Sequence, residues 1–170
     1  MAQQLRELLA VGDRKAIGRA SEVAFLVRAE PELLSELLGC LKAGDTTVCS
    51  HAAHALMQIA LEQPDLIQPY RKRLLAETCL VDQWEIQEQL MKILPLLHWT
   101  KGEQEAVLNL VRGNLGHKSA IVRTCALQAL YDFSRLDRTL LAELKKLLQQ
   151  MMDSGAKSSQ ARARKLLKKL

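Results

Sequence analysis

The chain repeats one pattern of nine residues. Residues 48–56 read VCSHAAHAL and residues 122–130 read VRTCALQAL, so both stretches carry Val, Ala, Ala and Leu at their first, fifth, eighth and ninth positions. These four positions lie on one face of an α-helix, because the helix turns once in about 3.6 residues. The pattern therefore predicts recurring amphipathic helices, each with the same apolar face to bury.

The same frame of four positions fits three further stretches, which begin at residues 17, 86 and 159. Successive starts are 31, 38, 36 and 37 residues apart, and a period of about 30 to 45 residues is typical of helical repeats. We predict frame helices near residues 13–29, 45–62, 82–98, 118–135 and 157–170. The frame residues of the three further copies are Ile17, Ser21, Ala24 and Phe25; Ile86, Leu90, Ile93 and Leu94; and Ser159, Ala163, Leu166 and Leu167.

A second amphipathic pattern precedes each later frame. These stretches cover residues 31–42, 64–77, 103–115 and 137–152, and a shorter one precedes the first frame. Aromatic residues make up only 4% of the chain while 48% is apolar, and the scarcity of aromatics disfavours a β architecture. The sequence therefore predicts one all-α domain over residues 1–170, in which two kinds of helix alternate.

The fourth frame resembles a known family. Val122 and Arg123, followed by Ala126, Ala129 and Leu130, resemble the second-helix signature of HEAT repeats, and Pro69 resembles the kinking proline of their first helix. The resemblance implies a right-handed α-α superhelix, a solenoid, of about five HEAT-like helix pairs. It also implies a non-catalytic scaffold or adaptor that binds a protein segment on a concave surface lined by the frame helices.

The third, seventh and tenth positions of each frame point away from the predicted buried face. From these rows we predict a binding surface for a protein partner whose identity the sequence does not specify. Apolar members of the rows have an alternative place, packed beneath neighbouring helices. The predicted contact residues are Arg19, His54, Met57, Glu88, Lys92, Gln128 and Tyr131.

Positive charge is concentrated at the end of the chain. Residues 142–170 hold eight Lys and Arg against two Asp and Glu, whereas the whole chain has a net charge of +5. An alternative function is therefore binding of nucleic acid or another anion through the last repeat. The competing interpretation is a solvated terminal cap. The residues of this possible site are Arg162, Arg164, Lys165, Lys168 and Lys169.

Other functional motifs are sparse. The sequence contains no glycine-rich phosphate loop and no GxSxG stretch, so we expect no enzymatic activity and no cofactor. His51 and His54 are three residues apart, but no carboxylate completes a local metal site, and we expect no metal. No stretch approaches the roughly 18 apolar residues needed to span a bilayer, and the four cysteines form no CxxC pair. We expect a cytoplasmic protein with reduced thiols that does not bind membranes.

Overall fold

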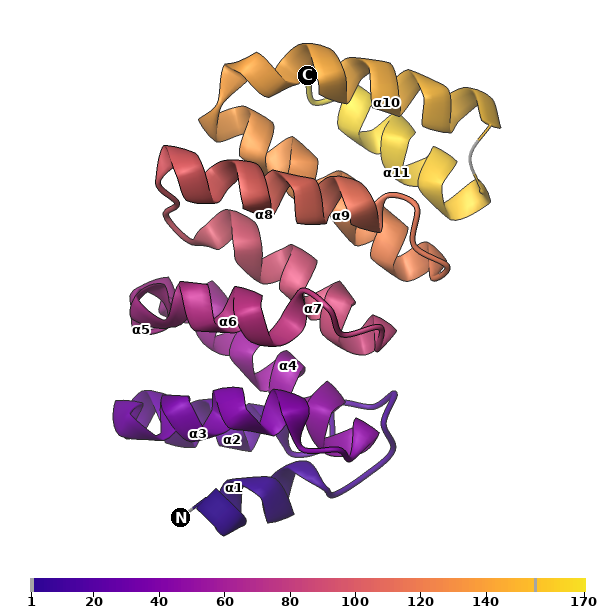
Figure 1. Cartoon of the computed structure of the whole chain (residues 1–170). Helices are drawn as coiled ribbons and strands as arrows, with labels where there is room; N and C mark the ends of the chain where they lie inside the picture. Colours follow the sequence, from indigo (N-terminus) through magenta and orange to yellow (C-terminus); the bar gives the residue numbers. More distant parts are fainter. Residues whose placement is uncertain (1, 155) are drawn as a thin grey trace. The chain divides into compact units, whose positions relative to one another are not determined.

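The computed structural model describes residues 2–154 and 156–170, and this part of the chain is all-α with no strand. It forms two compact units, Met1–His98 and Trp99–Leu170, whose elements can be followed by colour in Figure 1. In unit 1 the elements are α1 (Ala2–Leu9), α2 (Ala20–Ala29), η1 (Pro31–Leu33), α3 (Leu34–Gly39), η2 (Cys40–Lys42), α4 (Thr46–Glu62), α5 (Pro64–Ile67), η3 (Gln68–Tyr70), α6 (Arg71–Thr78), α7 (Trp84–Ile93) and η4 (Leu94–Leu96). In unit 2 they are α8 (Lys101–Asn114), α9 (Ala120–Leu136), η5 (Arg138–Leu140), α10 (Leu141–Ser154) and α11 (Lys157–Leu167).

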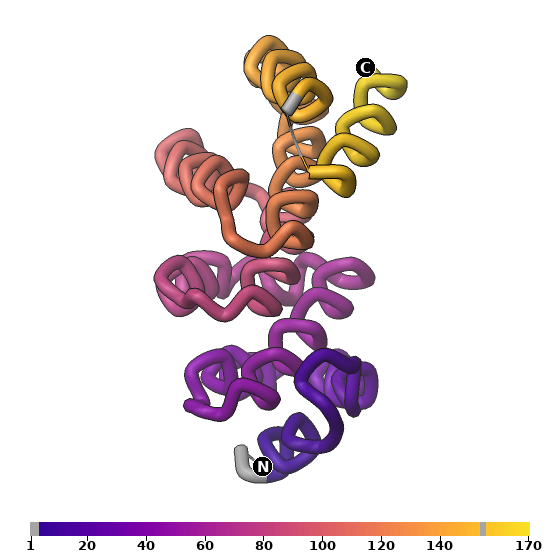
Figure 2. The backbone as a smooth tube through the Cα atoms, turned by 90° about the vertical axis from the view of Figure 1, so that its right-hand side faces the viewer, coloured from indigo at the N-terminus to yellow at the C-terminus, as the bar shows by residue number. Residues whose placement is uncertain are grey.

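Unit 1 has two layers of helices. Figure 2 shows α3 and the α5–α6 segment on one side of the unit and α2 and α4 on the other. Helix α4 packs against α2 and against α7, so it is covered on both flanks. Pro69 lies in η3, between α5 and α6, where its missing N–H interrupts the regular helix.

Unit 2 contains two helix pairs. Helix α8 packs on α9, and α10 packs on α11. Helix α9 also contacts α10 and α11, and its first turn is capped by Ser119, whose hydroxyl accepts from the Val122 amide. Glu143 of α10 accepts two hydrogen bonds from the Arg112 guanidinium of α8, at 2.8 and 2.9 Å.

The four frame positions are buried in α4, in α7 with the adjoining Leu94 of η4, and in α9. Every frame side chain of these three copies is at most 2% exposed, from Val48 in α4 to Leu130 in α9. In α11, Ser159, Ala163 and Leu166 are buried to the same degree, and Leu167 is half-buried. The prediction of a recurring buried face is confirmed for these helices.

The register predicted for the first frame is wrong. Ile17 and Phe25 are 51% and 63% exposed, and α2 begins at Ala20 rather than near residue 13. Residues 10–19 instead form an irregular connection that contains Gly12 and Gly18, both with positive φ. Because a right-handed helix cannot pass through a left-handed residue, the frame moves three residues on, and its buried members are Ala20, Ala24 and Val27.

Candidate functional site

A pocket of about 150 Å³ lies on unit 1, between the connection that precedes α2 and the helices α4 and α7. It brings together three of the predicted contact residues, His54 of α4 and Glu88 and Lys92 of α7. Its full lining comprises Arg14, Lys15, Ala16, Ile17, Ser50, His54, Trp84, Glu85, Glu88, Gln89 and Lys92.

Helix α4 holds this connection in place. The buried ring of His51 has Nδ1 2.8 Å from the Leu9 carbonyl oxygen and Nε2 3.0 Å from the Asp13 carbonyl oxygen. A neutral imidazole has one N–H and can donate to only one of these acceptors, whereas the imidazolium donates to both. The Ser50 hydroxyl donates to the Arg14 carbonyl oxygen at 2.8 Å. These contacts fix the backbone that carries Arg14 and Lys15 into the pocket wall.

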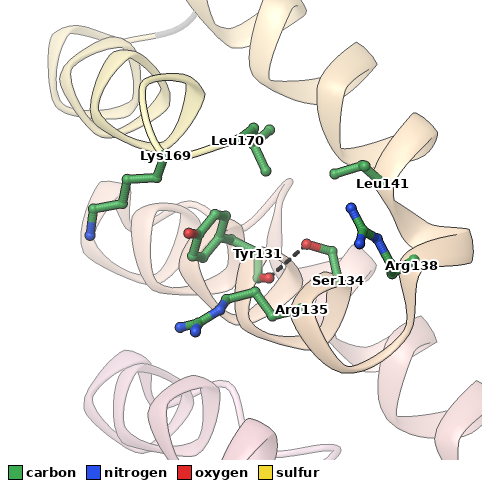
Figure 3. A pocket seen from close by; sticks show the side chains of 7 residues that line it. All are labelled: Tyr131, Ser134, Arg135, Arg138, Leu141, Lys169 and Leu170. Atoms are coloured by element: carbon green, nitrogen blue, oxygen red, sulfur yellow. Dashed lines mark hydrogen bonds between the residues drawn. The ribbon is translucent and has the colours of Figure 1, made fainter.

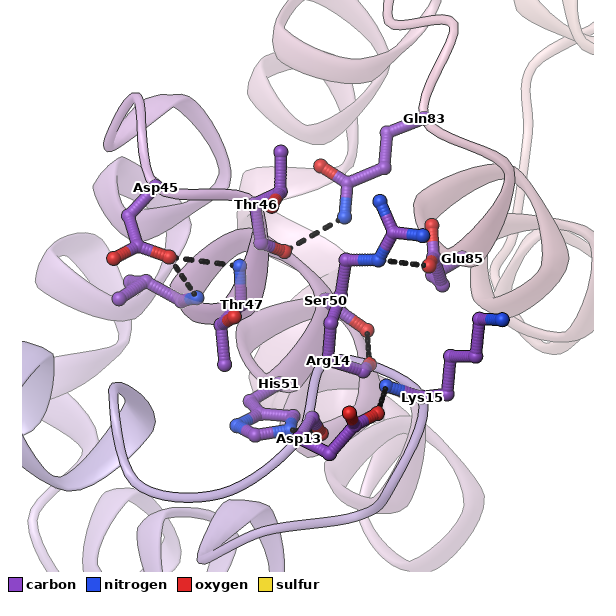
Figure 4. A network of polar contacts seen from close by, with 11 residues as sticks. Asp13, Arg14, Lys15, Asp45, Thr46, Thr47, Ser50, His51, Gln83 and Glu85 are labelled. Carbon is purple, nitrogen blue, oxygen red and sulfur yellow. Dashed lines mark hydrogen bonds and ion pairs between the residues drawn. The ribbon is translucent and has the colours of Figure 1, made fainter.

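An ion pair ties the connection to α7. Figure 4 shows the Arg14 side chain reaching Glu85, with Nε 2.9 Å from Oε1. The Glu85 side chain is only 5% exposed, and its position in the first turn of α7 also suits the positive end of the helix dipole. In the described residues Oε2 of Glu85 is buried without a hydrogen-bond donor. Since both carboxylate oxygens are buried, the Arg14 guanidinium is the group that compensates their charge.

The pocket wall carries charges of both signs. Lys92 Nζ donates to Glu88 Oε1 at 2.7 Å and lies 3.3 Å from the Gln89 amide oxygen. Burial, with Lys92 nearby, lowers the pKa of the His54 imidazole below its ordinary value, so this ring is neutral at pH 7. The ammonium group of Lys15 is exposed and makes no hydrogen bond or ion pair with the residues that the structure describes. The site thus combines paired charges, one unpaired cation, a neutral imidazole and the indole of Trp84.

The other predicted contact residues are placed differently. Arg19 is exposed, directly precedes α2 and pairs with Glu22 of that helix, at 2.7 Å. The prediction that Met57 and Tyr131 point to solvent is wrong, because they are 9% and 7% exposed. Met57 belongs to α4, which is covered by α2 and α7, and Tyr131 belongs to α9, which is covered by α8, α10 and α11. The alternative place for these apolar residues, beneath neighbouring helices, is where they lie.

Gln128 is engaged within unit 2. Its amide nitrogen donates to Asp132 Oδ1 and its amide oxygen accepts from Arg162, each at 3.0 Å. Arg162 is therefore partly used inside the unit, whereas the other four residues of the predicted anion site, Arg164, Lys165, Lys168 and Lys169, are exposed.

A second pocket, of about 240 Å³, lies on unit 2 and is shown in Figure 3. Of the predicted residues only Tyr131 and Lys169 line it. The Ser134 hydroxyl in its wall donates to the Tyr131 carbonyl oxygen at 2.7 Å. The remaining lining residues are Arg135, Arg138, Leu141 and Leu170.

Sequence reasoning missed Arg14, Lys15, Trp84 and Glu85 at the first pocket. The predicted frame helix begins near residue 13, and a regular helix over residues 13–17 would not bring Arg14 and Lys15 against α7. Gly18 was the available signal, since a glycine inside a presumed helix favours a break.

The structure places no group of three or more His, Cys, Asp or Glu side chains together as a metal site within the residues it describes. No described helix is both long and apolar enough to cross a membrane. Comparisons with protein-family models, with curated proteins and with solved structures found no match.

Proposed function

We propose that this protein is a non-catalytic scaffold of HEAT-like repeats that binds a protein segment at the unit 1 pocket. In this proposal about five helix pairs form a right-handed α-α superhelix, and the frame helices supply the binding surface. Repeats of this kind present extended surfaces rather than deep active sites.

One observation carries the proposal: the same four frame positions are buried in α4, in α7 with the adjoining Leu94, and in α9, in the order of the repeat. The third and seventh frame positions of two neighbouring helices, Ser50 and His54 in α4 and Glu88 and Lys92 in α7, meet at one pocket. A protein segment suits this pocket because its wall offers an aromatic ring and charges of both signs. Tryptophan and arginine are enriched among the residues that dominate protein interfaces.

The test is selection of short peptides from a random displayed library against the intact protein, followed by anisotropy titration of the selected peptides. Lys15→Glu reverses an exposed charge of the pocket wall, and Lys42→Glu makes the same change on an exposed residue of η2 outside the pocket. We expect Lys15→Glu to change the dissociation constant by about tenfold and Lys42→Glu by less than about twofold.

Equal effects of the two substitutions would place the peptide elsewhere on the molecule. The alternative of nucleic-acid binding would be favoured if no selected peptide saturated the protein below about 1 mM and the protein bound an oligonucleotide instead.

A further inference from the structure

The unit 2 pocket gathers three cationic side chains from three segments of the chain. Arg135 comes from the last turn of α9, Arg138 from η5, and Lys169 from the residues that follow α11. All three residues line this pocket of about 240 Å³, and Figure 3 shows Arg135 and Lys169 on one side of Tyr131 and Arg138 on the other. Leu141, the first residue of α10, also lines it, so the positive end of that helix dipole lies at the same place.

Carboxylates near the pocket are engaged elsewhere. Asp137 accepts from the Thr139 hydroxyl at 2.6 Å and from the Gln104 amide at 3.3 Å, and Glu143 is held by two hydrogen bonds from Arg112. Asp132 is half-buried and accepts from the Gln128 amide nitrogen. No carboxylate side chain lines the pocket.

In the part of the chain that the structure describes, the three cations form no close ion pair, although the Asp132 carboxylate interacts electrostatically with Arg135 and Lys169. Within the described residues, Arg135, Arg138 and Lys169 make no side-chain hydrogen bond and no ion pair within 4 Å. The whole of unit 2 is basic, since residues 99–170 contain 14 Lys and Arg against 6 Asp and Glu. Residues 1–98 contain 10 against 13. A hollow lined by several cationic residues attracts anions, and it attracts an anion with more than one charge most strongly.

We propose that this pocket binds the dianionic phosphate of a phosphomonoester. A monoester phosphate carries close to two negative charges at pH 7 and three acceptor oxygens, which suits two guanidinium groups and one ammonium group. The organic group of the ester can contact the apolar side chains of Leu141 and Leu170. A nucleic-acid strand fits less well, because Tyr131, the aromatic residue of the pocket, is buried, which leaves no exposed ring for base stacking.

The test is an NMR titration of the intact, ¹⁵N-labelled protein with a capped peptide of phosphoserine between two glycines. Any tag is placed at the amino terminus, because Lys169 and Leu170 line the pocket. We expect saturable shifts of the amide signals of residues 134–141, with a dissociation constant of about 0.1–1 mM. The unphosphorylated peptide should not bind, and the sulfoserine peptide, a monoanion of similar shape, should bind about fivefold more weakly.

A matched pair of double variants distinguishes binding in the pocket from non-specific electrostatic attraction of the phosphopeptide to a basic surface. Arg135→Ala with Arg138→Ala should weaken binding about tenfold or more, whereas Arg164→Ala with Lys165→Ala removes two exposed charges outside the pocket and should change it less than about twofold. Asp132→Asn should strengthen binding, because the Asp132 carboxylate interacts electrostatically with Arg135 and Lys169. Circular dichroism melts of each variant confirm that the fold is retained.

A titration with inorganic phosphate shows whether the pocket prefers a free phosphate ion or a phosphate ester. Equal affinity for inorganic phosphate and for the peptide would assign the pocket to free phosphate, and higher affinity for the peptide would assign it to an ester. Four results would overturn the proposal: equal weakening by both double variants, equal binding of the sulfated peptide, tighter binding of single-stranded octathymidylate, or no saturation below about 10 mM.

Discussion

Replacement of Gly18 by Ala tests how the connection before α2 is held against α4. A Cβ atom on Gly18 would lie 2.6 Å from the Val11 carbonyl oxygen and 2.7 Å from Nδ1 of His51, and closer still to Cε1 of that ring. The φ of Gly18 is +55°, a left-handed conformation that costs an alanine roughly 1–2 kcal/mol. The substitution therefore combines backbone strain with a collision against a buried side chain.

The free-energy cost of the collision can be estimated from the hydrogen bonds that His51 would lose. Its ring is fully buried and its nitrogens lie 2.8 and 3.0 Å from the carbonyl oxygens of Leu9 and Asp13. A neutral ring donates one hydrogen bond to these oxygens and a protonated ring two, so displacement of the ring loses one or two hydrogen bonds of about 1 kcal/mol each. With the backbone strain included, Gly18→Ala should lower the free energy of unfolding of unit 1 by roughly 2–4 kcal/mol.

Gly44 provides a matched control. Its φ is +78°, but a Cβ there would meet no atom within 4 Å, so Gly44→Ala should cost only the backbone strain, roughly 1–2 kcal/mol. Urea unfolding is followed by the fluorescence of Trp84 in the full chain carrying Trp99→Phe, which leaves one tryptophan, in unit 1. Equal costs for the two alanine substitutions would refute the collision. So would additivity with His51→Ala, because removal of the ring should relieve the part of the effect that comes from His51, while the backbone strain and the approach to the Val11 carbonyl oxygen remain.

Three further predictions concern caps, ion pairs and thiols. Asp45 accepts from the amides of Thr47 and Val48, so Asp45→Ala should destabilise unit 1 by about 1 kcal/mol in urea unfolding, and Asp45→Asn by less than half of that. Hydrogen bonds from Arg112 lower the pKa of Glu143, so this pair contributes stability above the carboxyl pKa of the unfolded chain and loses it as pH falls through the lower folded value. Because both side chains are about one-third exposed, Glu143→Gln should cost about 0.5–1 kcal/mol at pH 7, and a loss that persists at pH 2–3 would contradict the assignment. Burial raises the pKa of the Cys40 and Cys49 thiols, so iodoacetamide should label exposed Cys79 at least about tenfold faster, as followed by peptide mass spectrometry; equal rates would contradict the burial.

The buried faces of the helices could be predicted because a buried helix face requires apolar or small residues at helical spacing in the sequence. Positions such as Val48, Ala52 and Leu56 recur at helical spacing, and a helix that packs on both flanks admits only small or apolar side chains there. The same logic failed for the first frame. Ile17 and Ala24 have suitable spacing, but spacing does not report the left-handed φ of Gly18, which delays the start of α2.

The pockets could be predicted only in part, for a different physical reason. His54, Glu88 and Lys92 were found because they lie on regular helices at repeating positions. Arg14 was not found, since its contact with Glu85 joins residues 71 positions apart through an irregular connection. That contact depends on the tertiary hydrogen bonds of Ser50 and His51, which have no local signature in the sequence.

In the two binding proposals made above, chemical specificity lies where the repeat is broken. The frame positions are nearly interchangeable between helices, so they define packing and carry little information about a ligand. Lys15 and Arg138, by contrast, belong to the irregular connection before α2 and to the turn η5, and each lines one of the two pockets. Both side chains are exposed, so their removal takes little from the core and should change binding while leaving the free energy of unfolding nearly unchanged. Replacement of a frame residue such as Leu56 by Ala should do the reverse, because it opens a cavity in the core that costs several kcal/mol, and Leu56 lines neither pocket. In both proposals the repeated helices provide stability and the unrepeated turns provide recognition.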